Sequence, residues 1–165
     1  MSYERRDLVR KVLFVMVLMV VSASVAVSGG WDAKKGMGKV TVKGQLICLG
    51  CSLKKLDGTN AQCSLYTQHA IGFKTPDGTM WSIVDNEKGH DVINAHDVVE
   101  KKNAKITGWL SPIANFIEID TIEVDGVTAK EIQKAAWEQD QKIAKALAKR
   151  KVGEAPVVES HGHKH

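Results

Sequence analysis

Five short stretches with the composition of β-strands constrain the fold of this chain more than any other feature. The second and third flank Pro76-Asp77-Gly78, a turn in which proline presets φ, aspartate bonds to nearby backbone and glycine takes the left-handed position. That turn predicts a β-hairpin. Its inward side chains are expected to be Ile71, Phe73, Trp81 and Ile83. The five predicted strands cover residues 39–46, 69–75, 79–85, 104–110 and 116–124.

The alternation of polar and apolar residues changes parity within the last predicted strand. Its apolar side chains are those of Ile117, Ile119, Ile122 and Val124. Successive side chains of a strand point to opposite faces, so a change of parity requires one extra residue. We therefore predict a β-bulge near Asp120.

Two helical segments accompany the strands. Asp91 can cap a short helix that runs to about Glu100, between the third and fourth predicted strands. A long amphipathic helix is predicted over residues 128–152, and one stripe of it is expected to pack on the strands. That stripe contains Ala129, Ile132, Ala136, Ile143 and Leu147. A second, weaker stripe on another face contains Trp137, Ala144 and Ala148.

Five strands with a helix between the third and fourth follow the order of an OB-fold, a small Greek-key barrel. We predict a mainly β chain, with a five-stranded OB-fold-like Greek-key barrel over residues 39–127 followed by the long C-terminal α-helix. The segments 42–46, 104–110 and 115–120 resemble small exported bacterial OB-fold proteins, and the resemblance spans about residues 38–125. It implies a fold and says little about function, because OB-folds host many ligands.

The N-terminus has the layout of a secretory signal peptide over residues 1–28. Four basic residues precede the apolar run 12–21, and small residues follow it. The segment 4–10 resembles a twin-arginine export signal, whereas an ordinary Sec signal would also explain its arginines. An uncleaved anchor stays open, because the uncharged run approaches the roughly 17–20 residues that span a bilayer. We expect an exported protein, either periplasmic or anchored in the membrane and facing the periplasm.

The ends of the mature chain are expected to be irregular. Residues 29–38 are polar, contain glycine and are predicted to be a linker. Residues 153–165 are predicted to be a disordered tail, although its alternating His161, His163 and His165 could chelate a metal weakly.

Charge and composition argue against several classes of partner. The net charge of +4 falls to +2 without residues 1–28, which hold four basic and two acidic side chains, so nucleic-acid binding is not expected. Trp109 is the one outward aromatic residue we expect on the strands. No glycine-rich loop points to a nucleotide, and Ser52 rather than histidine follows Cys51, which argues against a c-type haem.

All three cysteines lie within 16 residues and a histidine follows them. Cys48, Cys51, Cys63 and His69 have the spacing Cys-x2-Cys-x11-Cys-x5-His. Three thiolates and an imidazole form a tetrahedral site suited to Zn2+, and soft thiolates also suit Cu(I). Cys48 ends the first predicted strand and His69 begins the second, so the four side chains can converge at one mouth of the barrel. The leading hypothesis is an exported binding module with a Cys3His soft-metal site.

Two alternatives to the metal site remain open from the sequence. A disulfide from Cys48 or Cys51 to Cys63 would suit an exported protein and leave one thiol over. The protein would then be an interaction subunit that docks through helix 128–152 on a larger periplasmic or membrane assembly, or that self-associates. A redox Cys-x-x-Cys would make it a thiol oxidoreductase, but no βαβ pattern surrounds the motif, and a binding protein is favoured over an enzyme. His90 and His96 are interpreted as surface or capping residues.

Overall fold

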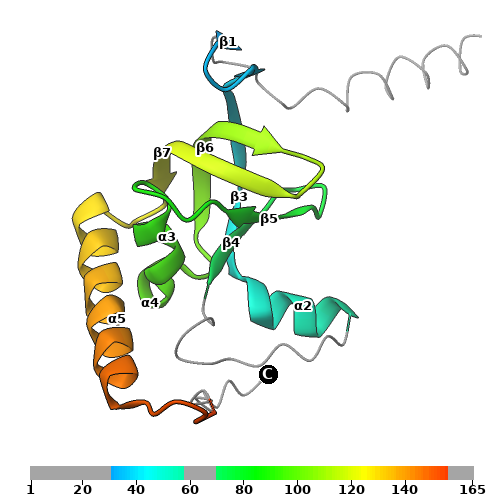
Figure 1. Cartoon of the computed structure of the whole chain (residues 1–165). Helices are drawn as coiled ribbons and strands as arrows, with labels where there is room; N and C mark the ends of the chain where they lie inside the picture. The colour runs from blue at the N-terminus through cyan, green and yellow to red at the C-terminus, as the bar shows by residue number, and fades with distance from the viewer. Residues whose placement is uncertain (1–30, 58–69, 156–165) are drawn as a thin grey trace, which may run out of the picture.

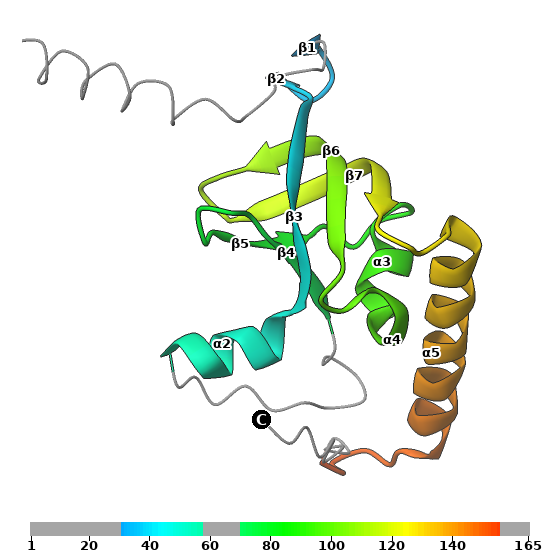
Figure 2. The same cartoon turned by 180° about the vertical axis from the view of Figure 1, so that it is seen from behind.

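A closed five-stranded barrel forms the centre of the computed structural model, which describes residues 31–57 and 70–155 (Figures 1 and 2). The order of neighbouring strands is β3-β4-β5-β7-β6, and β6 pairs with β3 to close the barrel. The strands are β3 Val40–Cys48, β4 Ile71–Lys74, β5 Met80–Ile83, β6 Asn103–Ser111 and β7 Phe116–Val124. The mainly β architecture, the five-stranded barrel and the long C-terminal helix are confirmed.

The barrel core consists of the side chains that the strand alternation turns inward. Its largest fully buried members include Leu46, Phe73, Ile106 and Ile117. The inward set predicted for the β4–β5 hairpin is confirmed, because Phe73 pairs with Trp81 and all four of its side chains are buried. Each such side chain stabilises the fold by about 1.5–3 kcal/mol through the apolar area that it removes from water.

The turn of this hairpin has the predicted chemistry. Gly78 has a φ of 90°. The carboxylate of Asp77 accepts hydrogen bonds from the hydroxyl of Thr75 and, at 3.2 Å, from the backbone N–H of Thr79. These hydrogen bonds lower the pKa of Asp77 from its ordinary value.

The predicted bulge lies at Asp120. Thr107 of β6 pairs with Thr121 of β7, whereas Gly108 pairs with Ile119, so Asp120 is the extra residue. A Cβ atom at Gly108 would lie 1.9 Å from the carbonyl oxygen of Glu118, so only glycine fits opposite the bulge. The bulge sets the outward direction of the Glu118 and Asp120 side chains.

Two short helices, α3 His90–Asn94 and α4 His96–Val99, lie between β5 and β6. Three apolar residues of this segment are buried: Val92, Ala95 and Val99 are 2%, 0% and 0% exposed. The predicted cap at Asp91 is wrong, because the segment starts one residue earlier, after Gly89. The backbone N–H of Gly89 donates to the side chain of Asn86 at 3.0 Å.

The C-terminal helix α5, Ala129–Lys149, begins with a capping box in which Thr128 and Glu131 bond to each other's backbone. It packs on α3 and α4 rather than along the strands (Figure 1). Of the predicted stripe, Ile132 and Ala136 are buried and Leu147 is 50% exposed. Within the described residues, none of the helices combines the length and the apolar character needed to cross a bilayer.

Two elements occupy segments that were expected to be irregular. The short strands β1 Trp31–Asp32 and β2 Met37–Gly38 form a hairpin in the predicted linker, where Asp32 accepts hydrogen bonds from the backbone of Lys34 and Lys35. Helix α2, Leu49–Asp57, follows β3 directly, although the turn-forming residues 57–60 predict a loop over residues 49–68. The two elements lie at opposite ends of β3 (Figure 2).

Candidate functional site

The junction of β3 and α2 positions the first two cysteines. Cys48 is the last residue of β3 and pairs with Ile71, and Cys51 lies in the first turn of α2. The backbone N–H of Leu49 donates to the carbonyl of Ala70 at 3.1 Å. The Leu49 side chain covers Gly72 so closely that a Cβ atom there would lie 2.3 Å from it. These contacts fix the start of α2 against β4.

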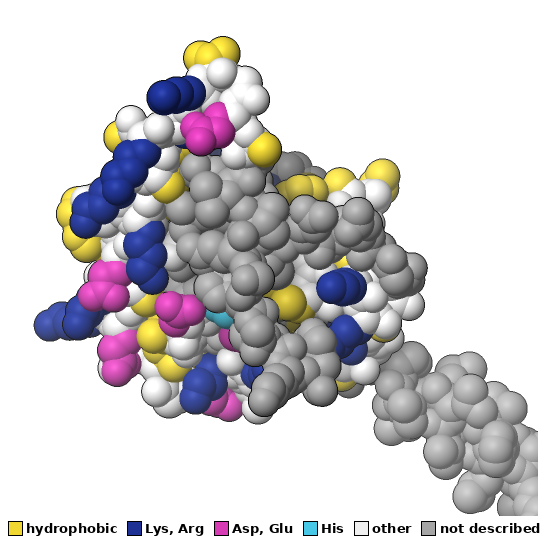
Figure 3. Space-filling model, turned by 90° about the horizontal axis from the view of Figure 1, so that it is seen from below, with side chains coloured by type: hydrophobic (Ala, Val, Ile, Leu, Met, Phe, Trp, Pro, Cys, Tyr) yellow, Lys and Arg dark blue, Asp and Glu magenta, His cyan; other side chains and the backbone are white. Residues whose placement is uncertain are grey.

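Both cysteines are lining residues of one cavity of about 260 Å3 between α2 and the outer face of the barrel. Cys48 is 2% exposed and Cys51 is partly exposed. Neither forms a disulfide in the described part of the chain. The remaining walls of the cavity are Gln45, Ile47, Ser52, Lys55, Leu56, Lys74, Met80, Glu100 and Lys101. The α2 side of the molecule, seen from below in Figure 3, shows lysine and hydrophobic side chains next to each other.

The structure therefore brings together two of the four predicted ligands. Cys63 and His69 lie outside the described residues, as do the signal segment 1–28 and the tail histidines. Among residues 31–57 and 70–155, no group of three or more histidine, cysteine or acidic side chains is arranged to hold a metal ion. The four-ligand site stays a prediction.

A second, larger hollow of about 760 Å3 crosses the outer face of β3 and shares Gln45 and Lys74 with the first. Its walls carry both signs of charge. Lys105, for example, donates to Glu123 of the neighbouring strand at 3.2 Å. Such a mixed lining favours no single class of ligand.

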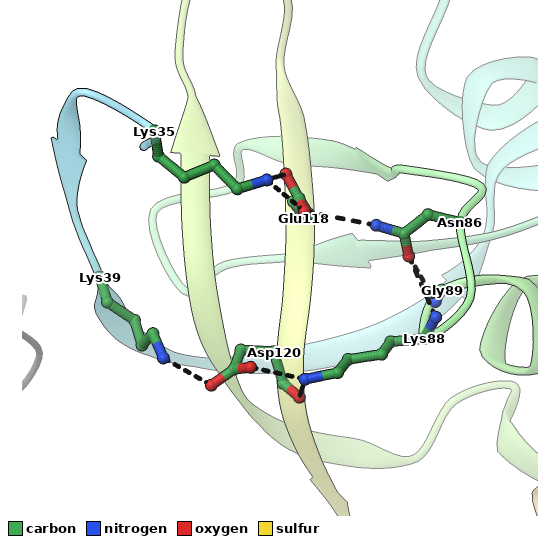
Figure 4. A network of polar contacts seen from close by, with 7 residues as sticks. All are labelled: Lys35, Lys39, Asn86, Lys88, Gly89, Glu118 and Asp120. Carbon is green, nitrogen blue, oxygen red and sulfur yellow. Dashed lines mark hydrogen bonds and ion pairs between the residues drawn. The ribbon is translucent and has the colours of Figure 1, made fainter. Parts of the chain in front are cut away.

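A network of ion pairs joins the N-terminal hairpin to the barrel (Figure 4). Asp120 accepts hydrogen bonds from Lys39 at 2.7 Å and from Lys88 at 2.6 Å. These two ammonium groups lower the pKa of Asp120 to about 2. Glu118 pairs with Lys35 and accepts a hydrogen bond from Asn86 at 3.4 Å. Every charged group of this network is paired within the molecule, with three ammonium groups on two carboxylates, so the network is structural.

Trp109 lies beneath the same hairpin. The ammonium groups of Lys35 and Lys39 lie 4.8 and 4.9 Å from the centre of its ring, within the range of a cation–π interaction. Its Nε1 atom is buried and has no hydrogen-bond partner in the described residues. The aromatic residue that the sequence marked as outward therefore serves to hold the hairpin.

His90 connects α3 to α5. Its Nδ1 atom lies 2.9 Å from a carboxylate oxygen of Asp85, and its Nε2 atom lies 3.3 Å from one of Asp140. The hydrogen bond to Asp85, supported by Asp140, raises the pKa of His90 above its ordinary value, although burial opposes the shift. His96 of α4 lies 3.2 Å from Asp97 and 3.4 Å from Glu100. Both histidines hold helices in place.

No protein-family model, curated protein or solved structure matches this chain. The functional argument therefore rests on the barrel and on the chemistry of the groups at its two ends.

Proposed function

We propose that this protein is an exported OB-fold binding module that holds a soft metal ion, Zn2+ or Cu(I), at the β3–α2 junction. Its ligands are Cys48, Cys51, Cys63 and His69. The observation that carries the proposal is the shared cavity: two cysteines three residues apart in the chain, at the end of β3 and in the first turn of α2, line one space. Adjacent thiolates on a turn are the usual first half of a zinc site.

The OB-fold assignment is supported by the topology of the barrel. Counted along the chain, its five strands neighbour one another in the order first, second, third, fifth, fourth. The third and fifth, β5 and β7, pair in parallel, and α3 and α4 lie between the third and fourth. This is the helix position and connectivity expected of a five-stranded Greek-key barrel.

The chain around Ala70 supports the place of the fourth ligand. Ala70 bonds through its carbonyl to Leu49, which lies between the two cysteines. His69 is joined to Ala70 by one peptide bond, which keeps consecutive Cα atoms about 3.8 Å apart. His69 is therefore one residue along the chain from Ala70, which contacts the turn that carries the two cysteines.

Metal analysis of the full exported chain, purified under reducing conditions, tests the proposal. We expect about one tightly held ion per chain, since a Cys3His set completes a tetrahedron. Cys51→Ser and Cys63→Ser should each remove it. Ser52→Ala, which alters the same cavity without touching a sulfur atom, is the matched control and should retain it. Reduced wild-type protein that binds neither Zn2+ nor Cu(I) would refute the proposal.

A second candidate function is a disulfide-stapled subunit that docks on a larger periplasmic or membrane assembly through α5. The exposed face of α5 favours it, because Trp137 is 64% exposed next to the buried Ala136. Counting thiols on the unreduced, metal-stripped protein separates the two functions. Three thiols support the metal site, and one supports the stapled subunit.

A further inference from the structure

We infer that the outer face of α5 binds the surface of a membrane that contains anionic phospholipids. The inference is independent of the metal site, and it gives α5 a lipid partner where the second candidate function gives it a protein assembly. The outer face is a set of α5 residues that follow one another at alternating spacings of four and three, which places them on one side of the helix. They are Lys130, Lys134, Trp137, Gln141, Ala144 and Ala148.

The outer face lies on the side of α5 away from the barrel. Helix α5 contacts α3 and α4 through its opposite side, where Ile132 and Ala136 are buried. Figures 1 and 2 both show α5 at the edge of the molecule, with α3 and α4 on its inner side. Trp137, Ala144 and Ala148 are all exposed. Within the described residues, this face is therefore open to a flat partner.

The second half of α5 and the residues after it carry a surplus of positive charge. Five basic residues and no acidic ones lie between Asp140 and Glu154, namely Lys142, Lys145, Lys149, Arg150 and Lys151. The three lysines that belong to α5 are exposed, and they have no carboxylate partner among the described residues. Lys145 lies one turn after Gln141, so this charge adjoins the outer face directly.

The three acidic side chains of α5 each have a partner within the molecule. Glu131 closes the capping box at the start of the helix. Glu138 lies 3.8 Å from Lys134, and Asp140 lies 3.3 Å from His90. The ammonium groups of the second half therefore attract a partner of negative charge.

The residue types of the outer face favour a lipid surface over a protein surface. Tryptophan has an apolar ring and a polar N–H group, which suits the boundary between lipid headgroups and acyl chains. Lysines beside it extend their charged ends to the lipid phosphates while their stems lie on apolar surface. Lysine is depleted at protein–protein interfaces. A second copy of α5 would bring Lys134 and Lys145 close to lysines of the same charge, which opposes self-association through this face.

Binding of the full exported chain to lipid vesicles tests the inference. Vesicles of phosphatidylcholine alone are compared with vesicles that also contain phosphatidylglycerol, because an N-terminal anchor would bind to both kinds. We expect stronger binding to the anionic vesicles, and this gain should shrink as salt is added. The triple variant Lys142→Gln, Lys145→Gln and Lys149→Gln should lower the binding to anionic vesicles by about tenfold or more.

The matched control removes the same charge elsewhere in the chain. Lys43, Lys54 and Lys102 are also exposed and have no carboxylate partner among the described residues. Replacing these three by glutamine should change the binding by less than about twofold, because charges far from the membrane are screened. Trp137→Gln changes an exposed side chain, so the fold should persist while the binding weakens.

Two readouts decide the outcome. Wild type that gains no affinity from phosphatidylglycerol would overturn the inference, as would equal losses in the two triple variants. If an N-terminal anchor retains all of the protein on both kinds of vesicle, the readout is quenching of tryptophan fluorescence by phosphatidylglycerol brominated in its acyl chains. Quenching that is smaller in Trp137→Gln than in wild type supports the inference, and equal quenching overturns it.

Discussion

The two ends of β3 are built from different chemistry. At its start, Lys39 and the hairpin residue Lys35 form ion pairs with two carboxylates of β7, and one of these, Asp120, also pairs with Lys88. At its end, Cys48 and the first turn of α2 border a cavity whose lining includes two cysteines and three lysines. Paired charges hold one end together, and the other end borders the open space where we propose that the metal ion binds.

The two ends of β3 show how a polar cluster that stabilises the fold differs from the proposed binding site. The hairpin network has more charged groups than the cavity, yet each of its carboxylates has its own ammonium partner (Figure 4). Matched pairs of this kind leave little to offer a ligand. Substitutions at the two ends of β3 should therefore have different effects on stability and on metal binding.

The largest effect should come from Gly72→Ala at the sulfur end. The new Cβ would lie 2.3 Å from the Leu49 side chain and 2.8 Å from the Trp81 carbonyl. We expect α2 to be displaced, with a loss of about 1–3 kcal/mol in the free energy of unfolding, together with weaker metal binding. Chemical denaturation and metal titration measure the two effects. Gly38→Ala at the hairpin end, where nothing lies within 4 Å of the added atom, should change neither. Equal effects of the two variants would contradict the contrast.

A smaller effect should follow from Asp120→Asn at the hairpin end. The variant weakens the ion pairs to Lys39 and Lys88, which are partly exposed, so we expect a loss of about 1 kcal/mol that shrinks at high salt. Because the folded pKa is lowered to about 2, the wild-type contribution is present above the unfolded value of 3.8 and is lost as the pH falls toward 2. Denaturation curves across pH 2–5 should show a steeper loss of stability in wild type than in Asp120→Asn, in which the lowered pKa of Asp77 still contributes. Metal affinity should be the same in both proteins, and a large change would show that the ends are coupled.

The smallest effect should come from His90→Gln, which touches neither end. The raised pKa of His90 means that its ion pairs with Asp85 and Asp140 stabilise the fold below its ordinary pKa of 6.5, and that this contribution is lost as the pH rises through the folded value. The thermal midpoint of wild type should fall slightly from pH 6 to pH 8. His90→Gln should lack that fall, and an identical pH dependence in the two proteins would rule out this role.

Much of the barrel could be predicted from local patterns. The turn at 76–78 and the alternation around it determine the β4–β5 hairpin, and the parity change in 116–124 locates the bulge at Asp120. Helix α2 was not predicted, because the turn-forming residues 57–60 indicate a loop. The signal that could have found it is the helical spacing of Leu49, Leu53 and Leu56.

The candidate site was harder to predict than the barrel. The sequence brings Cys48 and Cys51 together because they are close along the chain. It does not show which residues of the sheet line the cavity beside them, such as Lys74 and Met80, because that depends on where α2 lies over the sheet. The hairpin β1–β2 depends in the same way on distant partners, since Lys35 reaches Glu118 only in the folded chain. Contacts between residues so far apart in the sequence form only in the folded chain, so no local sequence pattern predicts them.

The parallel pairing of β5 with β7 is the shortest strand pairing of the barrel, with the residue pairs Ser82–Phe116 and Ile83–Ile117. Its backbone hydrogen bonds run from the amides of Ser82 and Val84, at 2.8 and 2.9 Å. Local opening of the barrel should start at this pairing. The amide hydrogens of Ser82 and Val84 should therefore exchange with solvent sooner than those of the long β6–β7 ladder.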